Sequence, residues 1–148
     1  MSRICLIVLF LLLQSTLSTA QTGYKDIDAE KYSRSALINI DSDTKTSVYY
    51  KDTSICKIRR EFIGGTFSST TIYYLKNGKL AESVYVSLRK PNVYFEEHLY
   101  FSNGKLVKWI TSDKKKGVPG SKAFTDKENL ALHFFETELN EVKDNTKK

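Results

Sequence analysis

Between Val48 and Ser112 the chain alternates apolar and polar residues and is interrupted at short intervals by turn-forming pairs. Tyrosine, phenylalanine, valine, isoleucine and threonine dominate this stretch, and these residue types favour β-strands. The interruptions are Gly64-Gly65, Asn77-Gly78, Pro91-Asn92 and Asn103-Gly104. Strands joined by such short turns pair with their chain neighbours as antiparallel hairpins. The pattern therefore predicts an antiparallel meander of five to six strands.

A polar loop over residues 113–124 separates the predicted strands from a segment with helical periodicity. Thr125 and Glu128 have the spacing of a capping box, and the helix is expected to end near Lys143. The apolar residues of the helix are Leu130, Ala131, Phe134, Leu139 and Val142. The predicted fold class is α+β, in which this C-terminal helix packs on one face of the meander. Residues 28–40 also carry helix formers with spaced apolar residues, and they allow a short N-terminal helix.

The two Asn-Gly pairs predict the register of the sheet, because both residues tolerate the positive φ of a two-residue type I′ turn. Counting outward from the turns places Leu75 opposite Leu80 and Tyr73 opposite Glu82. Side chains alternate between the two faces of a strand. The face expected to pack against the helix holds Cys56, Ile58, Phe62, Phe67, Tyr73, Leu75, Leu80, Val84, Val86, Leu88, Val93, Phe95, Leu99, Phe101, Leu106 and Ile110.

The opposite face of the predicted sheet is the main candidate for a binding surface. The same counting places His98 opposite Trp109, with tyrosines in the neighbouring rows. An exposed aromatic face suits a partner protein, a glycan ring or an apolar ligand. Cross-strand aromatic pairs also stabilise sheets, and the N-terminal segment could cover the face. The candidate binding residues are Tyr74, Tyr85, Tyr94, His98, Tyr100 and Trp109.

Two carboxylates offer an alternative, enzymatic function. Glu82 and Glu97 fall on adjacent strands on the predicted core face, together with Arg60 and Lys108. Buried charge costs free energy unless it is paired, so these residues lie at a rim, in a cavity or in ion pairs. Two carboxylates in a cleft can perform acid–base hydrolysis, but structural ion pairs produce the same cluster. A small hydrolase using Glu82 and Glu97 is therefore an alternative to a binding protein.

Other chemistry finds little support in the sequence. His98 shares a strand face with Glu96, but two ligands do not make a metal site, so no metal and no cofactor are expected. No catalytic residue is assigned. Cys56 is the only cysteine after residue 20, which leaves no internal disulfide. No phosphate-binding loop, dinucleotide fingerprint or nucleophile elbow occurs.

The first twenty residues have the features of a signal peptide. Arg3 precedes an apolar run, Ile4 to Leu13, that is too short to span a bilayer, and small residues end the segment at Ala20. Cleavage after Ala20 is expected, with an uncleaved anchor helix as the alternative. The cut removes Arg3 and lowers the formal net charge from +6 to +5. We expect a periplasmic or secreted protein with no integral membrane segment after cleavage.

The mature chain is expected to be a single α+β domain over residues 21–143, followed by a disordered tail over residues 144–148. The lysines at 114–116 and 147–148 are interpreted as a solvated loop and tail, so no nucleic-acid partner is expected. A second protein or an extracytoplasmic ligand is the expected partner.

The segments IYYLKNGKL and HLYFSNGKL resemble MORN-variant hairpin repeats. Such repeats recur in uncharacterised exported bacterial proteins and in some toxin-neutralising proteins. The resemblance covers residues 48–112 and implies repeated hairpins without implying catalytic residues. The leading hypothesis is an exported, non-catalytic binding protein that uses the aromatic sheet face. The second is an inhibitor or immunity-type protein that binds a partner enzyme.

Overall fold

The computed structural model describes residues 32–39, 41–89 and 93–146. The chain divides into Met1–Lys31 and Tyr32–Lys148, and the described residues belong to the second unit. The predicted signal peptide and the Pro91-Asn92 turn lie outside the described residues. Among the described residues, no helix is both long enough and apolar enough to cross a membrane.

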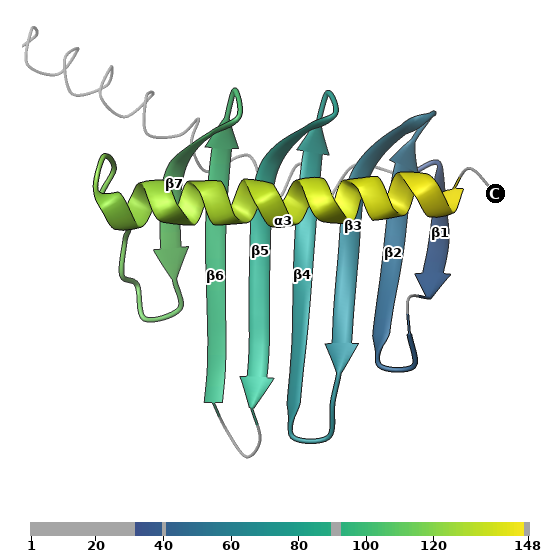
Figure 1. Ribbon diagram of the computed structural model, residues 1–148, viewed down its shortest axis with the longest axis horizontal. Coiled ribbons are helices and arrows are strands. Elements are labelled where there is room, and N and C mark those ends of the chain that lie inside the picture. The colour runs from purple at the N-terminus through teal and green to yellow at the C-terminus, as the bar shows by residue number, and fades with distance from the viewer. Residues whose placement is uncertain (1–31, 40, 90–92, 147–148) are drawn as a thin grey trace, which may run out of the picture. The chain divides into compact units, whose positions relative to one another are not determined.

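Seven strands form one antiparallel sheet in which each strand pairs with its neighbours in the chain, and one helix crosses a face of that sheet (Figure 1). The elements in order are β1 (Arg34–Asn39), β2 (Thr44–Lys51), β3 (Ser54–Ile63), β4 (Phe67–Lys76), β5 (Lys79–Arg89), β6 (Val93–Ser102), β7 (Lys105–Thr111) and α3 (Lys122–Thr146). The predicted α+β meander with a C-terminal helix on one face is confirmed.

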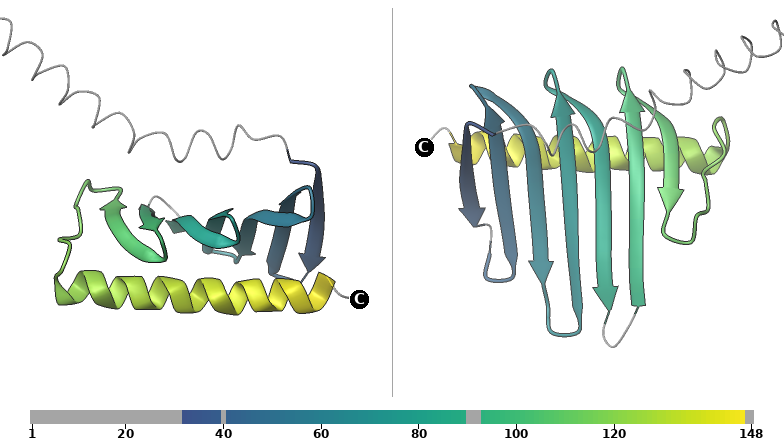
Figure 2. Two further views of the ribbon diagram at one scale, coloured as in Figure 1. Left: turned by 90° about the horizontal axis from the view of Figure 1, so that it is seen from above. Right: turned by 180° about the vertical axis from the view of Figure 1, so that it is seen from behind.

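Helix α3 is long enough to cross the whole width of the sheet. Its 25 residues extend about 37 Å at about 1.5 Å per residue, whereas seven strands spaced about 4.8 Å apart span about 29 Å. The helix begins beside β7 and ends beside β1 (Figure 1). Seen from above in Figure 2, it lies on one side of a single sheet layer. One helix can therefore cover the apolar centre of the whole sheet.

The short N-terminal helix allowed by residues 28–40 is wrong for the part that the structure describes, because residues 34–39 form β1. Local helix propensity is a weak preference that tertiary pairing overrides. Pairing with β2 satisfies the backbone groups on one edge of this segment, and its Ala36 and Ile38 pack against the core. The sheet consequently has seven strands instead of the expected five to six.

The predicted capping box is also wrong. The amide N–H of Phe124 donates to the Ser121 hydroxyl at 3.2 Å, so Ser121 caps the helix one turn earlier. The Glu128 carboxylate accepts instead from the backbone N–H of Leu106 at 2.7 Å, which ties the helix to β7. At its other end the helix continues to Thr146, beyond the expected Lys143, so residues 144–146 do not form the predicted tail.

Both Asn-Gly turns have the predicted conformation. Asn77 and Gly78 have φ of 52° and 73°, and Asn103 and Gly104 have φ of 50° and 77°. Only left-handed backbone at both positions makes a type I′ turn, so these angles confirm the assignment. The β2–β3 hairpin also has a two-residue loop, but of its two loop residues only Asp52 (φ 55°) has a positive φ, so this turn is not of type I′.

Each of these hairpins carries a register shift just beyond its turn. Leu75 pairs with Leu80 as predicted, but the next pair is Tyr74 with Glu82 instead of Tyr73 with Glu82. The extra residue is a β-bulge, and a slip of one residue moves every following side chain to the other face. Equivalent shifts lie at Tyr49/Tyr50 and Tyr100/Phe101. Four residues expected in the core face away from the helix instead: Val84, Val86, Leu88 and Ile110.

Three cross-strand rows of the helix-bearing face matter for the site. The inner row lies beneath α3 and comprises Val48, Ile58, Tyr73, Ser83, Leu99 and Trp109. The middle row comprises Thr46, Arg60, Thr71, Tyr85 and Glu97. The outer row comprises Phe62, Ser69, Ser87 and Phe95. Strands β3 to β6 extend past the helix on this face (Figure 1). Phe62 and Phe95 of the outer row are each 37% exposed.

Candidate ligand-binding cleft

A cleft of about 460 Å³ lies between α3 and the inner and middle rows of the sheet. The helix contributes one stripe of residues spaced three or four apart, which places them on the same side of the helix. This stripe consists of Lys127, Leu130, Ala131, Phe134, Thr137 and Glu138. From Lys127 to Glu138 the stripe is about 16 Å long at about 1.5 Å per residue. The cleft therefore follows the middle of the helix.

Short side chains explain why the space between helix and sheet is not filled. In the centre of the sheet, β4 contributes Thr71 and β5 contributes Ser83 to the cleft floor. The helix residue that faces this region, Ala131, is short as well. Protein interiors normally pack at crystal-like density, and side chains this small cannot bridge the distance. The cleft is thus a consequence of residue size in the two central strands.

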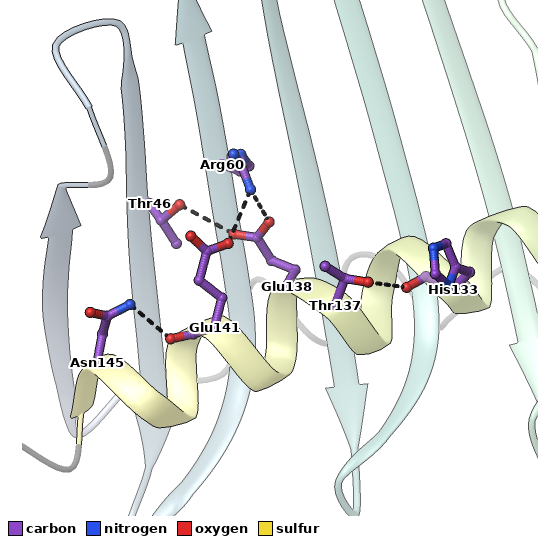
Figure 3. A network of polar contacts seen from close by, with 7 residues as sticks. All are labelled: Thr46, Arg60, His133, Thr137, Glu138, Glu141 and Asn145. Atoms are coloured by element: carbon purple, nitrogen blue, oxygen red, sulfur yellow. Dashed lines mark hydrogen bonds and ion pairs between the residues drawn. The ribbon is translucent and has the colours of Figure 1, made fainter.

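An ion pair closes the cleft at the β3 end (Figure 3). Arg60 Nη1 lies 2.5 Å from Glu138 Oε2 and 3.5 Å from Glu141 Oε2. The hydroxyl of Thr46 donates to Glu138 Oε1 at 3.2 Å. Burial by itself lowers the pKa of Arg60. The hydrogen bond to Glu138 and the charge of that carboxylate outweigh burial and raise the pKa of Arg60 above its ordinary value. Burial and the same carboxylate raise the pKa of Tyr73 to about 12.

A second ion pair closes the cleft at the β6 end. Lys127 Nζ lies 2.9 Å from Glu97 Oε1, and the indole N–H of Trp109 donates to the same oxygen at 2.9 Å. The Lys127 ammonium also lies 5.1 Å from the centre of the Trp109 ring. All four charged residues of the cleft lining are therefore paired with one another across the helix–sheet boundary.

The outer edge of the cleft is apolar and exposed. Leu130 and Phe134 line the cleft and are 49% and 54% exposed. On the sheet side, the Tyr85 ring lies 6.3 Å from the ring of Phe95, which is 37% exposed. Sequence reasoning missed this site, although the run of serine and threonine at residues 68–71 of β4 was a signal that the core would be shallow there.

The six residues predicted as one aromatic face are divided between the two faces of the sheet. Tyr85 and Trp109 lie on the helix-bearing face, because the bulges move them there. The other four lie on the opposite face: Tyr74, Tyr94, His98 and Tyr100. His98 pairs with Ile110 and not with Trp109. The predicted juxtaposition of His98 and Trp109 is therefore wrong.

The four residues on the face away from the helix differ widely in exposure. Tyr74 is fully buried, whereas Tyr94 is 54% exposed. His98 and Tyr100 are half-buried, and their rings stack with centres 6.2 Å apart and an interplanar angle of 13°. These residues do not form one exposed aromatic patch.

The carboxylate pair of the hydrolase hypothesis is separated by the sheet. Glu82 contacts His98 on the face away from the helix, whereas Glu97 contacts Lys127 on the helix-bearing face. Acid–base chemistry by two carboxylates needs both on the same side of one substrate-sized space. The expectation that Glu82 and Glu97 share a face is wrong. The hydrolase hypothesis therefore has no geometric support from this pair of carboxylates.

His98 lies between two carboxylates. Its Nδ1 is 3.2 Å from Glu82 Oε1, and its Nε2 is 2.7 Å from Glu96 Oε1. The hydrogen bond to Glu82 is the largest cause that raises the pKa of His98, and Glu96 adds to it against the opposing effect of burial. Tyr94 donates its hydroxyl to Glu96, which lowers the pKa of that carboxyl. The arrangement favours the imidazolium form.

This arrangement predicts a pH-dependent stability. A raised pKa in the folded state stabilises the fold below the unfolded value of about 6.5, and the gain is lost as pH rises through the folded pKa. From about pH 6 to about pH 9, we expect wild type to lose about 1 kcal/mol of unfolding free energy relative to His98→Gln. Urea unfolding at each pH measures the difference. His133→Gln, at an exposed helix position, serves as the control, and parallel profiles for wild type and His98→Gln would contradict the assignment.

Metal and thiol chemistry have no support in the part of the chain that the structure describes. Within it, no cluster of three or more histidine, cysteine, aspartate or glutamate side chains could hold a metal ion. The Cys56 thiol is buried and lies 3.3 Å from the carbonyl oxygen of Tyr49.

Fold and site together define a seven-stranded antiparallel meander crossed by one long helix, with a cleft beneath the edge of that helix. Comparison with known proteins finds no matching family model, and no curated protein or solved structure is similar to the chain.

Proposed function

We propose that this protein is an exported, non-catalytic binding protein that holds an apolar ligand in the cleft between α3 and the sheet. The observation that carries the proposal is a cleft of about 460 Å³ whose charged residues are paired internally and whose edge is apolar and exposed. Small-molecule sites are typically about 300–1,000 Å³, with apolar walls and a few oriented polar groups. The cleft has this composition.

Polar groups on the cleft floor can orient a ligand. Thr71 and Ser83 on the sheet and Thr137 on the helix place hydroxyl groups on the lining. The Thr137 hydroxyl already donates to the carbonyl of His133 at 2.9 Å (Figure 3), so it is available mainly as an acceptor. A ligand that covers Leu130 and Phe134 would remove their apolar surface from water at about 25 cal/mol per Å².

Both carboxylates of the cleft are paired with a cation, which favours a binding function over a catalytic one. Glu138 is held by Arg60 at 2.5 Å and Glu97 by Lys127 at 2.9 Å, and both side chains are almost fully buried. Proton transfer to a substrate would require separating one of these buried carboxylates from its cation, which costs several kcal/mol. The signal-peptide pattern of residues 1–20 supports the exported part of the proposal.

A filled cleft tests the proposal. Thr137→Trp places a large ring in the cleft from an exposed helix position. We expect wild type to bind the apolar probe N-phenyl-1-naphthylamine saturably, with a rise in probe fluorescence, and the variant to bind it at least about tenfold more weakly, a loss of about 1.4 kcal/mol. Asn129→Trp is the matched control, because it adds the same ring at an exposed helix position outside the cleft. Equal probe binding by all three proteins, or no saturable binding by wild type, would overturn the proposal.

A further inference from the structure

We propose that the ligand is an unbranched alkyl or acyl chain that extends from the cleft along strands β4 and β5 and across the outer row of the sheet. This inference rests on the proposed function and names the chemical class of its ligand. It follows from the arrangement of residues in the outer row, from the continuity of that row with the cleft and from the pairing of every charged cleft residue.

The outer row is a strip of short side chains between aromatic rings. Ser69 and Ser87 lie directly opposite each other on β4 and β5, and Phe62 and Phe95 flank them on β3 and β6. Strand side chains stand roughly perpendicular to the sheet, so phenyl rings rise above the serine hydroxyls. Phe62 and Phe95 are each 37% exposed. The strip thus presents two apolar walls to a ligand over a low floor.

This strip continues the floor of the cleft. Thr71 and Tyr85 line the cleft and lie two residues along their strands from Ser69 and Ser87, a rise of about 7 Å. Beyond the serines, Phe67 lies on the same face, and its ring is 6.1 Å from that of Phe62. From Tyr73 to Phe67 the β4 part of this path is about 20 Å long.

The chemistry along this path suits a long, uncharged chain. Arg60 and Lys127 are each paired with a carboxylate of the lining, so no unpaired charge of the cleft attracts an ionic ligand. The exposed groups along the path are the side chains of Leu130 and Phe134 on the helix and the rings of the outer row, and at its far end Arg89 lies opposite Phe67 and is exposed to solvent. A compact ligand would leave the rings of the outer row in water, whereas an extended chain would cover them. Covering them is favourable, because apolar surface leaves water.

A chain-length series tests the inference. Hexan-1-ol, octan-1-ol, decan-1-ol, dodecan-1-ol and tetradecan-1-ol would each compete with N-phenyl-1-naphthylamine for wild-type protein. We expect the affinity to rise about fourfold with each added methylene group through the longest alcohols. In the Phe62→Ser, Phe95→Ser double variant, hexan-1-ol is expected to bind as tightly as in wild type. The affinity for longer alcohols is expected to stop rising at an intermediate chain length.

The control removes apolar side chains that lie outside the path, on β3 and β5. Ile63 and Leu88 are 67% and 42% exposed and lie on the face away from the helix. The Ile63→Ser, Leu88→Ser double variant is expected to keep the full chain-length dependence. The wild-type series decides the inference by itself if a variant does not fold.

The outcomes separate this inference from the proposed function. An affinity that stops rising at octan-1-ol in wild type, or alcohols that do not displace the bound probe, would overturn the inference and leave the cleft as a site for a compact ligand. Failure of wild type to bind the probe would overturn the proposed function itself. Dodecanoate and dodecanoyl-lysophosphatidylcholine compared in the same assay distinguish a free chain from one carried by a lipid.

Discussion

Phe135→Ala is expected to lower the free energy of unfolding by about 4 kcal/mol, because it removes a buried ring from the contact between α3 and the sheet. The Phe135 side chain is 5% exposed, and its ring centre lies 5.6 Å from that of Tyr73 in the inner row. The removed atoms lose their transfer free energy and leave a cavity that rigid strands beneath the helix fill only in part. Urea unfolding followed by circular dichroism measures the change.

The neighbouring phenylalanine is a matched control for this substitution. Phe134 is 54% exposed and lines the cleft. Phe134→Ala is expected to change stability by less than about 1 kcal/mol, since little buried surface is lost, but to weaken binding of N-phenyl-1-naphthylamine. Two adjacent substitutions would thus separate stability from binding. Equal destabilisation by both would show that the helix packs on the sheet in a different rotation.

Arg60→Leu is expected to destabilise the protein by about 3 kcal/mol, because the Glu138 carboxylate would remain buried without its cation. The Glu138 side chain is 5% exposed, and Arg60 lies 2.5 Å from it. Arg60 Nη1 also lies 3.5 Å from Glu141 Oε2. Thermal and urea unfolding measure the loss.

The double variant Arg60→Leu, Glu138→Leu provides the internal control. Replacing a buried ion pair by apolar side chains is often close to neutral, so the double variant is expected to be more stable than Arg60→Leu alone. It is not expected to regain full stability, because the buried Thr46 hydroxyl would lose its acceptor. Together with the single variant Glu138→Leu, these two proteins and wild type form a mutant cycle. Additive losses would mean that Arg60 and Glu138 do not stabilise each other.

Local sequence patterns predicted much of the architecture. Alternating apolar residues and short turns indicated β3 to β7, and helical periodicity indicated α3. The Asn77-Gly78 and Asn103-Gly104 turns were assigned correctly, because positive φ at two consecutive positions is a strong local restriction. These features depend on a few neighbouring residues, and so the sequence expresses them directly.

The candidate site could not be predicted in the same way. A single extra residue in each hairpin, such as Ala81 after Leu80, reversed the faces of the following residues and moved Tyr85 and Trp109 beneath the helix. Nothing in the local pattern distinguishes a bulge from a continuous ladder here, because both faces of β5 and β6 carry apolar and polar residues. The aromatic-face prediction failed for this reason.

The ion pairs and the cleft could not be predicted either, because they depend on contacts between residues far apart in the sequence. Arg60 and Glu138 are 78 residues apart in the sequence, and Glu97 and Lys127 are 30 residues apart. Each pair forms only because α3 crosses the strands, and the cleft exists only because Thr71 and Ser83 are short where the helix passes over them. Each of these contacts depends on where the helix lies over the sheet.

The amino-acid sequence by itself determined the class of fold, the order of β3 to β7 and α3, and the geometry of the two Asn-Gly turns, since turn chemistry and periodicity act over a few residues. The tertiary structure decided which side chains share a face, which charges pair and where space remains unfilled. Those properties arise from the bulges and from the position of one helix across seven strands, and both depend on packing of the whole sheet.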